Sequence, residues 1–248
     1  MKTYRTWSAV AIILLSSIIA LAQEKAEVWS WNSIEAEKGK MADLEKAIKD
    51  KTEKYNKLAV DPINTWRVMS GPRMGQLVRA IGPKDWSYYD KPSEGAKYFD
   101  QVAGPFIAKQ SGREFFVREK DMSYNGTGVT TTPKFIEVNE FMVRPDKEYE
   151  FVNFVREITR VVAQNKSKGR YSTYRNVSGT TGTKYVVVWA HESLTELDDN
   201  SEKWSEWYNK LKGSPNAWSK DLNAVNGIYE IYGTNSFMCT LVPELSSK

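Results

Sequence analysis

Two six-residue stretches of the chain are nearly the same: WRVMSG at Trp66–Gly71 and YRNVSG at Tyr174–Gly179. Each places an aromatic residue before an arginine, each ends in Ser-Gly, and they lie 108 positions apart. In both places a second apolar run follows after a short turn with a glycine at each end, which is the pattern of a β-hairpin. We interpret the repeat as the trace of a duplicated module.

The order of predicted elements around the two stretches supports this interpretation. Apolar and aromatic runs predict strands, and stripes at helical spacing predict helices. In the first half the strands are at 28–36, 64–71, 75–81 and 113–124, and the helices at 38–58 and 96–109, the second of them broken near Gly104-Pro105. In the second half the strands are at 134–143, 170–179, 182–191 and 227–242, with helices from Pro145, at 201–211 and at 215–225. Both halves therefore have the order β-α-β-β-α-β.

The division of the chain follows from this order. Residues 125–134, NGTGVTTTPK, have turn chemistry and no apolar period, so they are the predicted linker. We expect a signal peptide at 1–22, a first module at 23–124 and a second at 135–248. Asp146 is the expected N-cap of the helix that Pro145 opens, and the predicted buried stripe of that helix is Phe151, Phe154, Val155, Ile158 and Val162.

A strand with one bare face should alternate apolar and polar residues, but YVVVWA at Tyr185–Ala190 is apolar on both faces. A second sheet packed on that face would cover it. The element order, the repeat and a strand that is apolar on both faces are together features of a known group. In these features the chain resembles the dimeric α+β barrel superfamily, which is built on ferredoxin-like modules. The resemblance implies an α+β fold: two ferredoxin-like β-α-β-β-α-β modules whose antiparallel sheets pack face to face as a barrel in one chain.

That superfamily includes small cofactor-free monooxygenases, haem-degrading enzymes, haem peroxidases, chlorite dismutase-type enzymes and ligand-sensing modules. The fold alone selects none of these. The sequence has no dinucleotide-binding, P-loop, nucleophile-elbow, paired-cysteine or zincin motif, so we expect no cofactor and no metal site. Whether the protein is an enzyme stays open.

The first residues predict export. Lys2 and Arg5 precede the uncharged apolar run Ala9–Leu21, and Ala20-Leu21-Ala22 fits a signal-peptidase site. The alternative is a retained anchor, but the run is shorter than the ~20 residues that span a bilayer. We expect a periplasmic or secreted protein with no integral membrane segment in the mature chain.

The net charge of the chain does not indicate a particular kind of partner. The formal net charge is +4, and removal of Lys2 and Arg5 lowers it further, so nucleic acid is not an expected partner. A tandem pair already supplies both halves of the barrel, so we expect a monomer that is a pseudo-dimer. The single cysteine, Cys239, has no internal disulfide partner and is expected to be either a buried apolar residue or a reactive thiol.

His191 is the only histidine and ends a predicted strand. It is either a rim residue, a catalytic acid or base, or the axial ligand that a haem enzyme of this superfamily would need. Arg67 and Arg175 occupy the same place in both copies and are expected to line the barrel. There each would clamp a carboxylate or phenolate, unless it is paired with a neighbouring carboxylate or faces solvent.

Aromatic residues are the remaining candidates. Trp29 and Trp31 share a strand face and, with Trp66 and Tyr174, either form a ligand pocket or fill the core. The leading hypothesis is an exported protein that binds a small apolar or aromatic ligand, or a partner, in or beside the barrel. The alternatives are a cofactor-independent monooxygenase acting on an aromatic substrate and a haem-binding protein that uses His191.

Overall fold

The computed structural model describes residues 25–57, 61–179, 182–198, 202–226 and 229–248. The predicted signal peptide at 1–22 lies outside the described residues. Within those ranges, no helix has the length and apolar character needed to cross a membrane.

The elements follow the predicted order with one short additional strand. The strands are β1 (Val28–Ala36), β2 (Ile63–Val68), β3 (Leu77–Lys84), β4 (Ile107–Gln110), β5 (Glu114–Asn125), β6 (Phe135–Val143), β7 (Arg170–Ser178), β8 (Thr183–His191) and β9 (Tyr229–Leu241). The helices are α2 (Met41–Tyr55), α3 (Glu94–Val102), α4 (Glu148–Gln164), α5 (Trp204–Lys212) and α6 (Ala217–Asn226). β4 is the addition: it follows the break that the sequence predicts at Gly104-Pro105.

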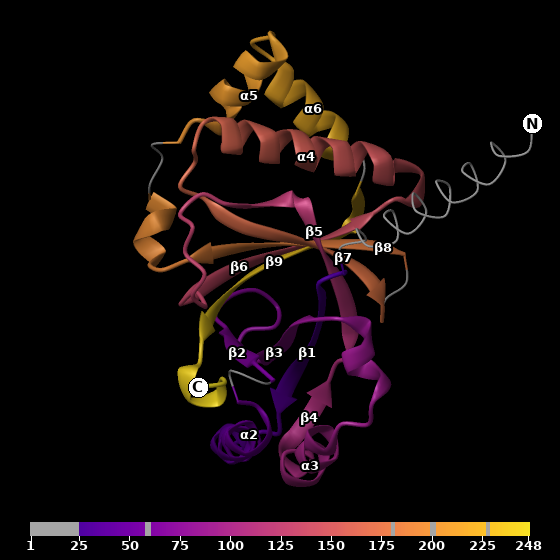
Figure 1. The fold of residues 1–248 in the computed structure, drawn as a ribbon, viewed down its shortest axis with the longest axis vertical. Coiled ribbons are helices and arrows are strands. Elements are labelled where there is room, and N and C mark those ends of the chain that lie inside the picture. Colours follow the sequence, from indigo (N-terminus) through magenta and orange to yellow (C-terminus); the bar gives the residue numbers. More distant parts are fainter. Residues whose placement is uncertain (1–24, 58–60, 180–181, 199–201, 227–228) are drawn as a thin grey trace, which may run out of the picture.

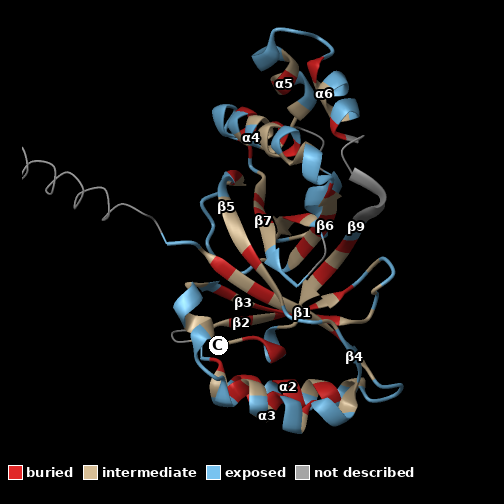
Figure 2. Cartoon of the chain, turned by 90° about the vertical axis from the view of Figure 1, so that its right-hand side faces the viewer, coloured by how far each residue is buried: buried red, intermediate tan, exposed pale blue. Residues whose placement is uncertain are grey.

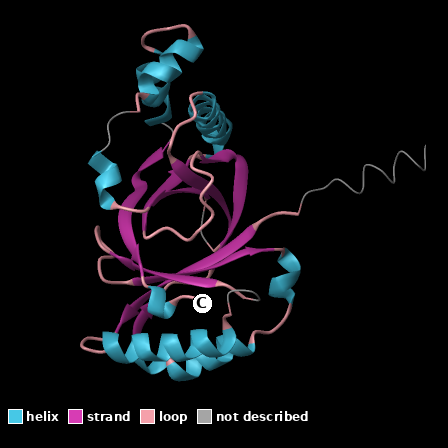
Figure 3. Cartoon of the chain, turned by 60° about the vertical axis from the view of Figure 1, so that its left-hand side comes forward, coloured by secondary structure: helices cyan, strands magenta, loops and turns pink. Residues whose placement is uncertain are grey.

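Eight strands close into an antiparallel barrel. The neighbours run β3-β2-β9-β6-β8-β7-β5-β1, and β1 pairs with β3 to complete the ring, while β4 lies beside the end of β1. Figure 3 looks into this barrel, with helices outside it on two opposite sides. In Figure 1, α4, α5 and α6 cover one side and α2 and α3 cover the other.

The two halves have the same strand order. It is β5-β1-β3-β2 in the first half and β9-β6-β8-β7 in the second. The sequence led us to expect two sheets packed face to face. In the structure the two sheets are also joined at their edges, because β2 pairs with β9 and β5 pairs with β7. Edge pairing is favourable because it satisfies the row of backbone N–H and C=O groups that a free edge strand exposes.

The repeated Ser-Gly lies at these two junctions. Gly71 and Gly179 both have positive φ, 79° and 100°, which starts each hairpin turn at little steric cost. A Cβ on Gly71 would lie 3.2 Å from the carbonyl oxygen of Ser236 on β9, and a Cβ on Gly179 would lie 2.9 Å from that of Arg113, next to β5. Glycine therefore allows the turns to approach the neighbouring half closely where the barrel closes.

Helix α4 buries its predicted face against the barrel. Phe151, Phe154 and Val162 are buried, and the helix packs on Tyr185 of β8. Figure 2 shows that buried residues band the strands and the helix faces turned toward them. The predicted cap is wrong, because a short 3-10 turn at Pro145–Lys147 precedes α4 and leaves Asp146 paired with Arg144 at 2.9 Å instead.

Candidate functional site

The barrel encloses a cavity of about 540 Å³, which we call the barrel cavity. Its wall is made by alternate residues of the strands, because successive side chains of a strand point to opposite faces. Both halves contribute lining residues, including Trp29, Trp31, Trp66, Val78, Ala80, Ile136, Val138, Ser172, Tyr174 and Val188. The volume lies within the range of small-molecule sites, about 300–1,000 Å³.

Aromatic rings form the wall beside β1. The ring centroids of Trp29 and Trp31 lie 5.8 Å and 5.7 Å from that of Tyr174, both edge to face, which is a favoured aromatic geometry. Trp31 also packs on Phe116, with centroids 3.7 Å apart. Because these rings contact one another, they hold a firm apolar surface suited to a planar ligand.

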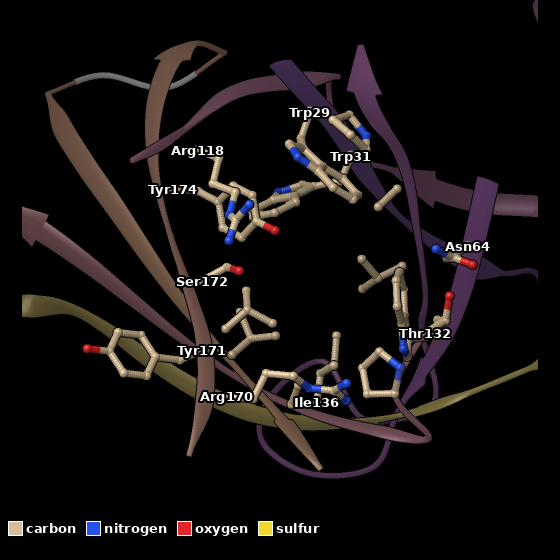
Figure 4. Close-up of a pocket in the computed structure, with 18 of the residues that line it drawn as sticks. Trp29, Trp31, Asn64, Arg118, Thr132, Ile136, Arg170, Tyr171, Ser172 and Tyr174 are labelled. Carbon is tan, nitrogen blue, oxygen red and sulfur yellow. The ribbon is translucent and has the colours of Figure 1, made fainter. Parts of the chain in front are cut away.

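A cation and two hydroxyl groups lie together on one side of the barrel cavity. Figure 4 shows Arg118, Ser172 and Tyr174 on that side, across from Asn64 and Thr132. Burial raises the pKa of the Tyr174 phenol, although the Arg118 charge and a hydrogen bond with Ser172 act in the opposite direction. The phenol is therefore neutral at physiological pH and can donate a hydrogen bond beside a permanent cation. This side can bind an oxygen atom that carries or develops negative charge.

Glu27 places a carboxylate next to this group. Its Oε2 lies 3.2 Å from Arg118 Nη1, and its Oε1 lies 3.1 Å from Lys120 Nζ. Partial burial alone would raise the pKa of Glu27, but hydrogen bonds from Lys120 and Arg118 outweigh it and hold the pKa below its ordinary value. Glu27 is therefore ionised at neutral pH, can accept a hydrogen bond, and neutralises part of the charge of Arg118.

The barrel end that carries the β2–β3 and β7–β8 turns, the hairpin end, is closed by buried charges. Lys184 Nζ lies 2.7 Å from Glu114 Oε2 and 3.4 Å from Glu140 Oε1. Arg73 Nη2 lies 3.0 Å from Glu140 Oε2, without the angle of a hydrogen bond, and its guanidinium lies over the Phe237 ring. Ion pairs between three strands and a turn thus close this end.

The opposite end, the linker end, is covered by the connection between the halves. Residues Val129–Pro133 line the barrel cavity, so part of the predicted linker is a wall of the site. Arg170 Nη1 donates hydrogen bonds to the carbonyl oxygens of Val129 and Thr131, at 3.2 Å and 3.4 Å, and its Nη2 pairs with Glu192. Asn125 Nδ2 also donates a hydrogen bond to the Val129 carbonyl oxygen, at 2.9 Å, so neutral hydrogen bonds to carbonyl oxygens hold this cover in place of the ion pairs of the hairpin end.

The structure brings four of the predicted residues together: Trp29, Trp31, Trp66 and Tyr174 all line the barrel cavity. Of the alternatives for Arg67 and Arg175, pairing with a neighbouring carboxylate agrees with the structure, and the ligand-facing position does not. Each follows an inward aromatic residue by one position and so points outward, where Arg67 pairs with Glu45 of α2 and Arg175 Nε lies 2.7 Å from Glu119. Pairing outside the barrel neutralises both guanidinium groups, although Arg67 Nε has no hydrogen-bond partner.

His191 does not reach the barrel cavity. It lies on the outer face of β8, and its Nδ1 is 3.4 Å from Glu196 Oε2. Since the chain has one histidine, the barrel cavity offers no imidazole to a haem iron, and haem binding through His191 inside the barrel does not fit this site. No cluster of three potential metal ligands occurs among the residues that the structure describes.

Cys239 is fully buried among the inward side chains of β9, and burial raises the pKa of its thiol to about 12. Of its two expected roles, the buried apolar residue agrees with this position. A thiol with so high a pKa is a weak nucleophile at neutral pH.

Sequence reasoning missed the polar residues of the site, Glu27, Arg118 and Ser172. A signal for Arg118 was present: it follows Phe116 by two positions in a predicted strand, so the two share a face. Ser172 precedes Tyr174 by the same spacing. The spacing alone does not indicate which face of each strand points into the barrel, because helices or other strands cover both faces.

No protein-family model matches the sequence, and no curated protein matches it. Solved structures do match in fold. A candidate monooxygenase from Fusobacterium nucleatum is 11% identical with a TM-score of 0.60, over 88% of this chain and 94% of that chain. An anthrone oxidase-like protein is 12% identical with a TM-score of 0.55, over 89% and 93%. A chlorite dismutase variant from Candidatus Nitrospira defluvii is 9% identical with a TM-score of 0.54, over 92% and 96%.

At such low identities the likeness concerns the fold alone. The chain has the dimeric α+β barrel fold, which confirms the resemblance drawn from its sequence. Within this fold, the barrel cavity is the site that any functional account of the chain has to explain.

Proposed function

We propose that the barrel cavity binds a planar aromatic ligand that carries an ionisable oxygen. The observation that carries this proposal is a hollow barrel of about 540 Å³ with aromatic rings on one wall and Arg118, Ser172 and Tyr174 on another. The rings of Trp29 and Trp31 offer apolar contact to the ligand's ring. Arg118 and Tyr174 bind its oxygen and favour the anionic form.

The second candidate function is cofactor-independent oxygenation of such a ligand. The specific observation in its favour is the group of Glu27, Arg118 and Tyr174 inside a largely apolar cavity. Arg118 and the Tyr174 phenol stabilise the oxyanion that remains when the substrate loses a proton to solvent, a preorganised arrangement typical of catalytic sites. An electron-rich anion of this kind reacts with dioxygen directly, so the neighbours described as monooxygenases are consistent with it.

The reaction balances without another reductant. For anthrone, a ring CH2 and one dioxygen molecule give anthraquinone and water. The carbanion left by loss of the first proton transfers an electron to dioxygen, and the two radicals join as a peroxide anion, which takes up a proton from solvent. Loss of the second C–H proton then forms the C=O bond, breaks the O–O bond and releases hydroxide, which leaves as water. Anthrone enters this proposal because one fold neighbour is described as anthrone oxidase-like. The residues of this chain bind the substrate, stabilise its anion and shield it from bulk water.

Binding is tested by titrating the purified mature chain with 2-naphthol and with naphthalene, following the quenching of tryptophan fluorescence. We expect 2-naphthol to bind more tightly, and its own pKa to fall on binding because Arg118 stabilises the anion. Arg118→Met should weaken 2-naphthol binding about 10-fold or more, the loss expected for a hydrogen bond to a charged group, and should leave naphthalene binding unchanged.

Arg175→Met is the matched control, since Arg175 pairs with Glu119 on the outside of the barrel. It should leave both affinities unchanged. If neither compound binds, or if both arginine variants act alike, the proposed site is wrong. Oxygenation has its own test: anthrone consumption with and without dioxygen, set against its spontaneous oxidation in buffer. If the chain binds anthrone and gives no rate above buffer, the oxygenase proposal fails while the binding proposal stands.

We also propose that the two halves are tandem ferredoxin-like modules that arose by duplication. Their shared strand order and the Ser-Gly at both junctions support this proposal. Because each half pairs with both edges of the other, a monomer needs no second copy to close the barrel, and sedimentation at several concentrations tests this. We further propose export with cleavage after Ala22. The N-terminal sequence of the protein recovered from its native host tests it.

A further inference from the structure

Trp29 lies directly against the backbone of β3 at Gly82. A Cβ built on Gly82 would lie 2.4 Å, 2.7 Å and 2.8 Å from three atoms of the Trp29 indole, Cδ2, Cε3 and Cγ. Such distances are far inside van der Waals contact, so any residue other than glycine would displace the ring. Because residue 82 is a glycine, the Trp29 indole can pack directly against the backbone of β3.

The local strand pairing explains how this contact arises. Val28 pairs with Lys84 and Ser30 pairs with Ile81, so Trp29 alone faces the two residues Gly82 and Pro83. Two residues opposite one define a β-bulge, a feature that redirects side chains. Here the bulge lies where Trp29 and Pro83 reach the wall of the barrel cavity.

The space on the other side of the indole belongs to the site. Trp29 lines the barrel cavity, and its ring meets Tyr174 edge to face at 5.8 Å. A ring pushed away from Gly82 therefore moves toward Tyr174 and into the barrel cavity. The width of the barrel cavity next to its polar side is thus set by the pair Gly82 and Trp29.

We propose that Gly82 is a specificity-determining residue that, by seating Trp29 against β3, keeps the barrel cavity wide enough for fused aromatic ligands of two or three rings. The proposal rests on the proposed binding function and refines its ligand class. Gly82 touches no ligand itself and acts through the position of the indole. A side chain at this position would leave room for a single ring.

The test compares phenol, 2-naphthol and 2-hydroxyanthracene as probes of increasing size. Gly82→Ala should weaken binding of 2-hydroxyanthracene by about 10-fold or more, the scale expected for forcing an extra methyl group into a packed site, and phenol binding by less than about threefold. Gly39→Ala is the matched control, because Gly39 also has a positive φ, 77°, while a Cβ there meets nothing within 4 Å. It should leave all three affinities unchanged.

The double variant Gly82→Ala/Trp29→Ala keeps the experiment decisive if Gly82→Ala alone folds poorly. Removing the indole removes the clash but leaves the backbone strain of a side chain at φ 154°. The double variant should therefore bind 2-hydroxyanthracene within about threefold of Trp29→Ala alone. Equal loss for all three probes, or no loss for the largest, would overturn the size-selection role. Absence of binding of every probe to the unsubstituted chain would instead contradict the proposed function.

Discussion

Replacing Lys184 by methionine should severely destabilise the barrel. Lys184 is buried, with 9% of its side chain exposed, and it neutralises Glu114 at 2.7 Å and Glu140 at 3.4 Å. After the substitution, Glu140 still has the cation of Arg73 beside it. Glu114 loses its cation and keeps only a hydrogen bond from Asn176. Removing one partner of a buried ion pair costs about 3–5 kcal/mol, because the other charge stays buried without compensation.

The free energy of unfolding is measured by urea denaturation, followed by circular dichroism and tryptophan fluorescence. A loss of that size lowers the midpoint of thermal unfolding by about 6–20 °C in a chain of this length. Lys97→Met is the matched control: its pair with Glu94 is exposed, at 66% and 75% of the two side chains, and such pairs contribute about 0–1 kcal/mol.

Adding Glu114→Gln to Lys184→Met should recover at least about 1 kcal/mol, because it removes the carboxylate charge that lost its partner. The reasoning is refuted if Lys184→Met unfolds within about 1 kcal/mol of Lys97→Met, or if the added Glu114→Gln destabilises it further. Either result would mean that these charges are hydrated and do not seal the hairpin end.

Three further predictions concern other parts of the barrel. Cys239, with its pKa raised to about 12, should not react with a disulfide reagent at pH 8 in the folded protein and should react once per chain in urea; reaction without denaturant would contradict its burial. Glu27 has a lowered pKa, so it contributes about 1 kcal/mol to the free energy of unfolding above the ordinary glutamate pKa, and this contribution is lost as the pH falls through the lowered value. Between pH 6 and pH 3, Glu27→Gln should therefore lose less stability than the unsubstituted chain. Equal losses would count against the ion pairs of Glu27 with Arg118 and Lys120. Leu245→Ala should lower the free energy of unfolding by about 2–5 kcal/mol, because Leu245 is 3% exposed and packs against α2. Leu211 is 40% exposed, so Leu211→Ala should lower it by less than about 0.5 kcal/mol. Similar losses for the two variants would show that the C-terminal turn is not part of the core.

The sequence predicted the elements well because their periods are strong. The helix stripe of α4 and the paired hairpins around Trp66 and Tyr174 appear where the spacing indicates. Closure of the barrel through strand edges could not be predicted, because backbone hydrogen bonds between distant strands leave no residue pattern.

The orientation of the strands limited the prediction of the site. The pair Trp66-Arg67 and the pair Tyr174-Arg175 each place neighbours on opposite faces, but helices cover the outside, so neither face is marked as solvent by polar residues. Glu45 on α2 and Glu119 on β5 decide the question by pairing with the arginines outside the barrel. These carboxylates lie 22 and 56 positions away in the chain, and single-sequence reasoning had no means to match them.

The central claim is that the closed barrel is hollow and receives a planar aromatic ligand. A crystal structure of the mature chain grown with 2-naphthol tests it most directly. We expect a flat ligand beside Trp31, with its oxygen within hydrogen-bonding distance of Arg118 or Tyr174. A barrel filled by its own side chains, or a ligand bound only outside the strands, would contradict it.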